Sequence, residues 1–339
     1  MSTSGHLLGR LSARGAVNPH TTSLMGLVVI VGLLFSIINP KVYPSVLNMQ
    51  SMAYALPEIG LLSLAVCVTM STGGIDLSIV ATANLSAITL AAVSGWQSSP
   101  AVLMTPVAVL AALAVGGACG AVNGLLVTRA RIAPILATLA SMQVYAGLAV
   151  LATKGKPLSS APNSVLALGT KTEAGVPVAF LVLLLAAALL WLIVNKTAFG
   201  WRLIFVGASA TAATYSGIQP GKVLLRTYLL AGLVSGLAGV MMLAHSAYAS
   251  ADYGSSYLLL AITIAVLGGT DPFGGRGPVL GVLVASLLLQ MVSSGFDIQG
   301  ISPYMFQATQ GLILAGVLVA ASRRGGLGRL RRRAKLAPT

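Results

Sequence analysis

Long apolar stretches alternate with short polar or glycine-rich connections along almost the whole chain. The stretches are continuous and rich in Leu and Ala, without the alternation of a barrel strand, so they predict helices. Their number predicts an all-α, polytopic membrane protein with about ten transmembrane helices. The predicted segments are 24–38, 51–70, 77–93, 101–127, 134–151, 176–194, 223–244, 258–267, 279–292 and 304–321.

Two of these segments, 258–267 and 279–292, are short for a bilayer core of about 30 Å at about 1.5 Å per residue. We expect them to extend into the flanking connections or to lie partly buried in the bundle. The whole chain is expected to form a single transmembrane domain. Within it we expect a cytosolic N-terminal segment at 1–21, a helical bundle at 22–322 and a basic cytosolic tail at 323–339.

The composition excludes an ordinary soluble domain. Of the 339 residues, 56% are apolar and only 8% are charged, whereas a soluble domain carries about 25% charged residues. The charged surface is therefore too small to cover a water-soluble globule of this length.

The net charge of +14 is explained by membrane topology. With ten crossings and a cytosolic N-terminus, only Lys41, Lys154, Lys156 and Lys171 among the 20 Lys and Arg residues fall in outer loops. This positive-inside bias places both termini in the cytosol. It gives no support for a nucleic-acid partner, and the basic tail is expected to lie near anionic membrane lipid.

The chain has few groups suited to ion coupling. Coupling to protons or sodium usually needs carboxylates, histidines or broken-helix carbonyls near the membrane midplane. Glu58, in the outer half of its segment, is the one exception among the carboxylates. His245 is expected to stand alone at the end of its segment. The remaining candidates are assigned to outer loops or termini: Glu173, Asp252, Asp297, His6 and His20. We therefore expect either a partner that supplies energy or a passive channel.

Two aspartates follow glycine pairs at the ends of apolar segments. Gly73 and Gly74 precede Asp76, and Gly268 and Gly269 precede Asp271. Two such carboxylates are compatible with an acid/base dyad of an intramembrane enzyme, but capping of the following helix is the more ordinary role. The cluster at 268–277 lacks the lysine of a phosphate-binding P-loop, so ATP binding by that route is excluded.

The remaining special residues favour structural roles. Most of the 38 glycines are expected to allow close helix packing, in particular at 116–120 and 232–239, where they recur every three or four residues. Cys67 and Cys119 lack the spacing of a metal or disulfide site and are expected in the core. We predict neither a metal site nor catalytic residues.

The mixed stretch 195–222 contains small residues from Ala208 to Tyr215, which predict about two helical turns on the cytosolic side. A short helix with a small-residue face suits a groove on another protein. A linker lying on the membrane surface is an equal alternative.

Four ordered motifs resemble the permease subunits of ribose-type sugar ABC importers, a family that also serves autoinducer-2. The motifs are TGGIDLS at 72–78, a TL...G segment within 135–148, the cytosolic loop at 207–218, and LGGT...FGGRG at 267–277. The similarity covers about residues 40–320. Leu258 and Leu260 stand where the family has acidic residues.

The resemblance implies partners and site residues. The partners would be an ABC ATPase subunit that holds ATP and Mg, a second permease copy or paralogue, and an extracytoplasmic sugar-binding protein, in the inner membrane of a bacterium. No cofactor is implied on this chain. The ATPase-coupling loop would be Gly207, Ala212, Ala213, Ser216, Gly217 and Ile218. The signature and gating turns would be Gly73, Gly74, Asp76, Ser78, Gly268, Gly269, Asp271, Gly274, Gly275 and Arg276.

Few polar side chains are available to line a solute pathway. The candidates are Asn84, Asn123, Thr138, Gln143 and Gln290, and Asn84 and Gln143 equally suit hydrogen bonds between helices. A selective sugar site needs several fixed donors and acceptors. We therefore expect a passage of low selectivity. A secondary transporter lined by backbone carbonyls is the remaining transport alternative.

Overall fold

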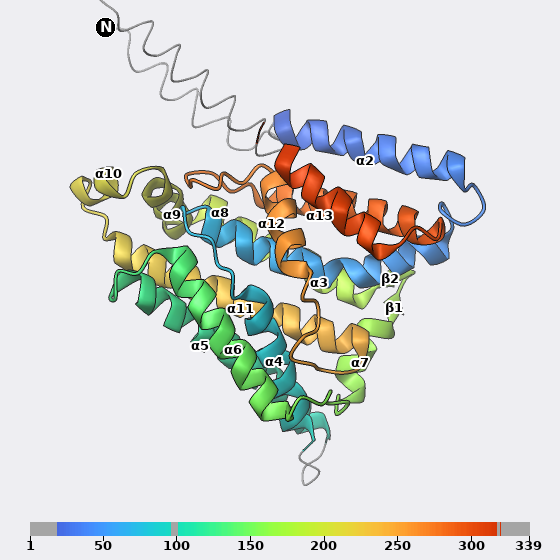
Figure 1. Cartoon of the computed structure of the whole chain (residues 1–339), viewed down its shortest axis with the longest axis horizontal. Helices are drawn as coiled ribbons and strands as arrows, with labels where there is room; N and C mark the ends of the chain where they lie inside the picture. Colours follow the sequence, from blue (N-terminus) through green and yellow to red (C-terminus); the bar gives the residue numbers. More distant parts are fainter. Residues whose placement is uncertain (1–18, 96–100, 317–318, 320–339) are drawn as a thin grey trace, which may run out of the picture.

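The computed structural model describes residues 19–95, 101–316 and 319. Most of the predicted N-terminal segment at 1–21 and the basic tail at 323–339 lie outside these residues. The described chain is a bundle of packed helices (Figure 1). Its elements are α2 (Pro19–Ile38), α3 (Val46–Met70), α4 (Ile79–Ser94), α5 (Ala101–Thr128), α6 (Pro134–Thr153), α7 (Asn163–Thr170), β1 (Thr172–Glu173), β2 (Val176–Pro177), α8 (Val178–Lys196), α9 (Ala198–Ala208), α10 (Ala210–Tyr215), α11 (Pro220–Ser246), α12 (Tyr257–Leu267) and α13 (Val279–Ile298), followed by helical residues 303–316.

Each predicted apolar segment corresponds to a helix as far as it is described, apart from residues 77–78, which precede α4, and 176–177, which form β2, so the helical fold class is confirmed. Within the described residues, 7 helices are long and apolar enough to cross a membrane, namely α2, α3, α5, α6, α8, α11 and α13. The predicted segment 279–292 extends to Ile298 in α13, so this helix has 20 residues and is long enough to cross a membrane, as expected. By contrast, α12 has only 11 residues, and much of it is buried in the bundle.

One local prediction is wrong, and two connections contain elements that the sequence did not predict. Asp297, expected in an outer loop, lies in the last turn of α13, because the helix continues past the apolar run. The stretch 154–175 contains the short helix α7, and β1 pairs with β2 in an antiparallel hairpin. The mixed stretch after α8 begins with another helix, α9, whose start is capped by the Thr197 hydroxyl that accepts from the Gly200 N–H.

Opposite ends of the bundle carry different connections (Figure 1). We call the end with α9, α10 and loop 268–278 the α10 end, and the end with α7, β1 and β2 the hairpin end. Connections and helix termini at the α10 end carry Arg129, Arg131, Lys196, Lys222 and Arg276, whereas those at the hairpin end carry Lys41, Lys154, Lys156 and Lys171. The distribution matches the grouping expected from the sequence.

Glycines bring α5 and α11 into close contact, as their spacing predicts. A Cβ atom added at Gly120 would lie 2.2 Å from the Tyr228 carbonyl oxygen, and one at Gly116 would lie 2.5 Å from the Gly232 carbonyl oxygen. Only residues without a side chain allow this backbone approach. The contact places α11 at the centre of the bundle, where it also packs against α3 and α4.

Two connections unwind inside the bundle. Residues 71–78 run from the α10 end to the start of α4, and residues 247–256 run from the hairpin end to the start of α12 (Figure 1). Both following helices are short, with 16 residues in α4 and 11 in α12. Irregular backbone within a membrane protein needs side-chain partners, so these connections are where polar residues are expected.

Candidate functional site

Two glycine-rich connections and the last turn of α9 meet at the α10 end. The Gly275 N–H donates to the Ser71 carbonyl oxygen at 2.9 Å. A Cβ atom at Gly207 would lie 2.0 Å from that same oxygen, and one at Gly274 would lie 2.7 Å from the Gly73 nitrogen. We call Ser71, Gly73, Gly207, Gly274 and Gly275 the glycine junction. It brings together three of the four motifs recognised in the sequence.

Two backbone conformations at the junction require glycine. Gly73 has φ +80° and Gly274 has φ +91°, values that side-chain-bearing residues rarely adopt. The predicted pair Gly268 and Gly269 lies beside the junction, where Gly268 packs against the start of α13 and Gly269 against His20. Arg276 is exposed, and its side chain lines a cavity of about 280 Å³ together with Lys196 and Trp201.

Asp76 is buried in a network that fixes the unwound connection 71–78. Its Oδ1 accepts from the Ser78 N–H at 2.8 Å and from the Ser78 hydroxyl at 2.7 Å. Asn123 of α5 donates to the Ser78 Oγ at 2.7 Å and approaches the Asp76 Oδ2 at 3.4 Å. Tyr145 of α6 hydrogen-bonds to the Asn123 Oδ1 at 3.1 Å. The network ties the connection to α5 and α6 and uses one predicted pathway residue, Asn123, as a scaffold partner.

Thr138 ties the same connection to α6. Its Oγ1 accepts from the Leu77 N–H at 3.1 Å and lies 3.1 Å from the Ile75 carbonyl oxygen. The Tyr228 hydroxyl is buried against Gly74 and has no hydrogen-bond partner among the described residues. Asp76, Asn123 and Thr138 therefore occupy one polar region, which the sequence motifs alone did not connect.

The prediction that both aspartates cap the next helix is wrong in its geometry. Asp76 bonds to the Ser78 N–H, one residue before α4, and the exposed Asp271 accepts from the Phe273 N–H at 2.9 Å within its own loop. Both are Asx turns, in which a side chain bonds to the backbone two residues on. None of the described hydrogen bonds joins Asp76 to Asp271, and their unequal burial does not resemble a dyad sharing one proton.

The predicted coupling loop forms two helices instead of one. Ser209 is extended, with φ −166°, and its hydroxyl accepts from the Ala212 N–H at 3.2 Å, which ends α9 and starts α10. Ala213 is buried, whereas Ala212 is exposed. The C-terminal turn is closed by Ser216 and Gly217, and the Ile218 N–H donates to the Ala213 carbonyl oxygen.

Two exposed aromatic side chains at the α10 end were not predicted as site residues. Tyr215 and Phe273 are each 90% exposed, on α10 and on the loop of the glycine junction. Aromatic residues so exposed beside polar surface are typical of contact sites for another protein. Their exposure cannot be read from the sequence.

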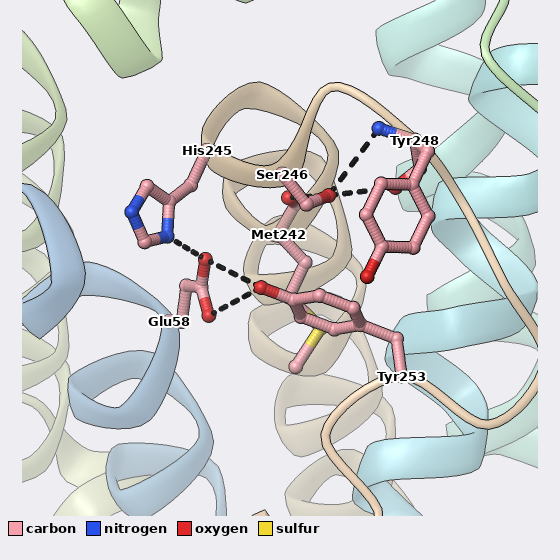
Figure 2. Close-up of polar contacts among 6 residues, drawn as sticks. All are labelled: Glu58, Met242, His245, Ser246, Tyr248 and Tyr253. Carbon is pink, nitrogen blue, oxygen red and sulfur yellow. Dashed lines mark hydrogen bonds and ion pairs between the residues drawn. The ribbon is translucent and has the colours of Figure 1, made fainter.

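A second buried carboxylate lies toward the hairpin end. Glu58 of α3 accepts from His245 of α11, with 2.6 Å between Nδ1 and Oε1, and from the Tyr253 hydroxyl at 3.3 Å (Figure 2). The expectation that His245 stands alone is therefore wrong. The two residues are separated by 187 positions, so no local pattern connects them. Tyr257 also interacts with this carboxylate.

The remaining predicted pathway residues are Asn84, Gln143 and Gln290, of which only Asn84 makes hydrogen bonds among the described residues. The Asn84 amide donates to the carbonyl oxygens of Ala251 and Tyr253, at 3.0 and 2.9 Å, and so holds the unwound connection 247–256 against α4. Gln143 is exposed on α6 and Gln290 is half-buried on α13, and neither has a hydrogen bond among the described residues. Asn84 therefore acts as a tie between segments.

No group of three or more His, Cys, Asp or Glu side chains gathers within the part of the chain that the structure describes. Cys67 and Cys119 are free and buried. The buried carboxylates are instead satisfied by hydroxyl, amide and imidazole groups, which is the arrangement expected when such groups lie within a membrane protein.

The chain matches permeases over most of its length. The family model for the permease component of branched-chain amino acid transport systems matches residues 48–321. The ribose import permease protein RbsC of Bacillus subtilis (strain 168) is 33% identical over 292 residues, covering 86% of this chain and 88% of that protein. The autoinducer 2 import system permease protein LsrD of Escherichia coli (strain K12) is 30% identical over 309 residues, covering 88% and 91%. No solved structure gives a significant match. These similarities favour neither the intramembrane enzyme nor the secondary transporter.

Proposed function

The chain belongs to the permease component family of branched-chain amino acid transport systems, and we propose that it is the membrane subunit of an ATP-driven importer for a monosaccharide-like solute. Relatives that import ribose and autoinducer 2 match nearly the whole chain and support this solute class. The observation that carries the proposal is the glycine junction, where three motif segments meet at the end of α9, which leads through Ser209 into α10.

We propose that α10 and the junction loop form the docking surface for an ABC ATPase subunit, which holds the ATP and Mg. Tyr215 and Phe273 present exposed aromatic rings there. Movement imposed on α10 would pass through Ser209 to α9 and from there to Ser71 and Gly275, because Gly207 of α9 packs directly against both. This chain itself holds no cofactor in the proposal and makes no covalent change to the solute.

The importer needs further partners. We propose a second permease copy or paralogue and an extracytoplasmic binding protein that delivers the solute, whereas nucleic acid is not a partner. Helices α2, α6 and α8 each expose many large apolar side chains. Such faces suit the lipid and a second permease chain.

The proposed topology places the α10 end in the cytosol of a bacterium and the hairpin end outside the inner membrane. Basic residues at the α10 end support this orientation, as does the cavity lined by Lys196, Arg276 and Trp201, which suits the headgroup layer of anionic lipid. The short helices α4 and α12, each continued by an unwound connection, and helix 303–316 would complete about ten crossings and bring both termini to the cytosol.

Cysteine labelling tests this topology. Because Cys67 and Cys119 are the only two cysteines, they are first replaced by Ser, and single cysteines are then placed at Ser159 or Ser209. An impermeant thiol reagent is expected to label position 159 from outside intact cells and position 209 only in inverted vesicles. The reverse pattern would contradict the orientation.

Coupling is tested with Ala212→Glu in the purified complex with its ATPase and binding protein. The new carboxylate would be buried without a partner in the docking surface, which is strongly unfavourable. Solute-stimulated ATP hydrolysis is expected to disappear. Ala130→Glu, at an exposed position of the α5–α6 connection, serves as the matched control. Normal stimulation in Ala212→Glu would contradict the docking surface.

We further propose that the binding protein sets the solute identity and that the permease is a passage of low selectivity. Most polar groups in the bundle are already used by the scaffold, as the bonds of Asn84, Asn123 and Thr138 illustrate. Sugar binding by the permease–ATPase complex without the binding protein is expected to be weaker than roughly 10 μM, about −7 kcal/mol. Tighter binding would overturn low selectivity.

A further inference from the structure

The pair of Glu58 and His245 differs from a closed internal ion pair because only one partner is buried. The Glu58 side chain is 2% exposed, whereas the His245 side chain is 39% exposed. The Nδ1 atom of His245 faces the carboxylate and the Nε2 atom is on the far side of the ring (Figure 2). Nε2 has no hydrogen-bond partner among the described residues.

His245 opens into a cavity of about 250 Å³ near the hairpin end, which we call the outer cavity. Its lining consists of Leu47, Gln50, Ser51, Tyr54, Gly169 and His245. The volume is close to the lower limit of about 300 Å³ for small-molecule pockets. The cavity therefore has room for one small ring but not for a large ligand.

The lining offers neutral hydrogen-bonding groups. The Gln50 Nε2 donates to the Gly175 carbonyl oxygen at 3.0 Å, and the Tyr54 hydroxyl donates to the Thr170 carbonyl oxygen at 2.7 Å. These bonds hold both side chains in place and leave the Gln50 carbonyl oxygen and the Tyr54 lone pairs as acceptors. The lining contains no Lys or Arg and no carboxylate. This chemistry suits a neutral solute with several hydroxyl groups better than an ion.

Glu58 determines what His245 presents to the cavity. An ionised carboxylate only accepts hydrogen bonds, so His245 keeps a proton on Nδ1, and Nε2 is left to hydrogen-bond with a group in the cavity. The hydroxyl group of Tyr253 donates to the carboxylate and keeps it in place behind the ring. Glu58 is thus a positioning residue, and His245 is the group that reaches the solute.

We propose that the outer cavity is a weak contact site for a neutral polyhydroxylated solute, which hydrogen-bonds through a hydroxyl group to His245 Nε2 and bonds to Gln50 and Ser51. The inference rests on the proposed function, because it places the contact where an extracytoplasmic binding protein would release its cargo. Weak binding there is compatible with a passage of low selectivity.

Nuclear magnetic resonance of ¹⁵N-histidine tests the contact directly. The chain contains only 3 histidines, and His20 is distinguished because its Nε2 bonds to the Leu267 carbonyl oxygen at 2.9 Å. The full-length permease with its ATPase is placed in lipid nanodiscs and titrated with millimolar D-ribose. The Nε2 resonance of His245 is expected to shift with concentration while that of His20 stays constant. A His245 resonance that does not move would overturn the contact site.

Variants of the cavity give a second readout. Gln50→Ala and Ser51→Ala are each expected to raise the KM of ATP-dependent uptake about three- to tenfold, the loss expected for one hydrogen bond, with the maximal rate unchanged. Gln299→Ala, an exposed glutamine outside the cavity, is the matched control. Unchanged KM values in both cavity variants would also overturn the site.

The two proposals fail in different ways. If the wild-type complex imports sugar with ATP but His245 does not respond and the KM values do not change, the importer stands and the outer cavity is wrong. If no sugar is imported, the proposed function is wrong, and the His245 titration still decides whether the cavity binds a polyol.

Discussion

Asp76 and Glu58 are both buried carboxylates beside an unwound connection, but their surroundings differ. The Asp76 oxygens face Ser78 and Asn123, which are also buried, and none of these residues lines a described cavity. Glu58 faces His245, which opens into the outer cavity. Burial of a carboxylate within a membrane protein therefore does not by itself indicate solute contact. The exposure of its partner separates a scaffold from a binding group.

The α10 end and the hairpin end of the molecule also differ, in their packing and in the residues that line their cavities. At the α10 end, backbone meets backbone without intervening side chains, as at Gly207 and Ser71. Such a contact transmits displacement because packed backbone cannot compress. Both ends also have a cavity, but the one at the α10 end is lined by Lys196 and Arg276, whereas the outer cavity between α3, α7 and α11 has no Lys, Arg or carboxylate in its lining. We interpret the first end as the coupling region and the second as the solute-contact region.

The largest effect is expected from a methyl group in the glycine junction. In Gly207→Ala the Cβ would lie 2.0 Å from the Ser71 oxygen and 2.6 Å from the Gly275 nitrogen. Overpacking of this kind costs about 1–3 kcal/mol or more. The melting temperature should fall, and uptake should drop more than about tenfold. Gly147→Ala, where nothing lies within 4 Å of the new Cβ, is the control and should retain stability. Equal behaviour of the two variants would contradict a tight junction.

The next largest effect concerns the scaffold around Asp76. Asp76→Ala leaves the N–H and the hydroxyl of Ser78 without their acceptor, at a cost of about 1–3 kcal/mol per unpaired group. Asp76→Asn retains the Oδ1 acceptor and should recover much of that stability, with an unchanged KM of uptake. Asp297→Asn, at an exposed position in the last turn of α13, is the control and should match the wild type. A KM change in Asp76→Asn, measured beside its thermal unfolding, would show that Asp76 contacts solute.

The sequence predicts the helices well because the apolar runs themselves define them. Even the α5–α11 contact follows from sequence, since glycines every three or four residues mark a close helix face. The ends of the helices and the local turns were harder to predict. α13 continues to Ile298 beyond its apolar run, and the Ser209 cap divides α9 from α10, because hydrogen bonds rather than hydropathy set those limits.

The candidate site was only partly predictable. The motifs marked Gly73, Gly207 and Gly274, but only the fold shows that they touch. The pairing of Glu58 with His245 joins residues that belong to different helices and to no common motif. Long-range pairs of this kind depend on tertiary packing, so single-sequence reasoning had no signal for them.

A smaller effect is expected when only the positioning residue changes. Glu58→Gln keeps the size of the side chain, but its amide is able to donate to His245 Nδ1 and move the ring proton to Nε2. We expect the KM of uptake to rise about threefold, the effect of weakening one hydrogen bond, with little change in maximal rate. The ¹⁵N resonances of His245 should report the change of tautomer. An unchanged resonance would contradict the role of Glu58.

The smallest effect is expected at an exposed acid near the same cluster. The Ser250 hydroxyl donates to Asp252 and lowers the pKa of this carboxyl below its ordinary value. A lowered pKa in the folded state stabilises the protein above the unfolded pKa of about 3.9, and this contribution is lost as pH falls through the folded pKa. Ser250→Ala should therefore be slightly less stable than the wild type at pH near 7. Thermal unfolding across pH should show the difference shrinking in acid, and a difference that grows in acid would contradict the bond.

The separation of the two ends is tested most directly by uptake kinetics in proteoliposomes that contain the permease, its ATPase and the binding protein. Ala212→Glu at the α10 end is expected to lower the maximal rate of ATP-dependent D-ribose uptake with an unchanged KM. Gln50→Ala at the hairpin end is expected to raise KM with an unchanged maximal rate. If both variants alter the same kinetic parameter, the account of one coupling end and one solute-contact end is contradicted.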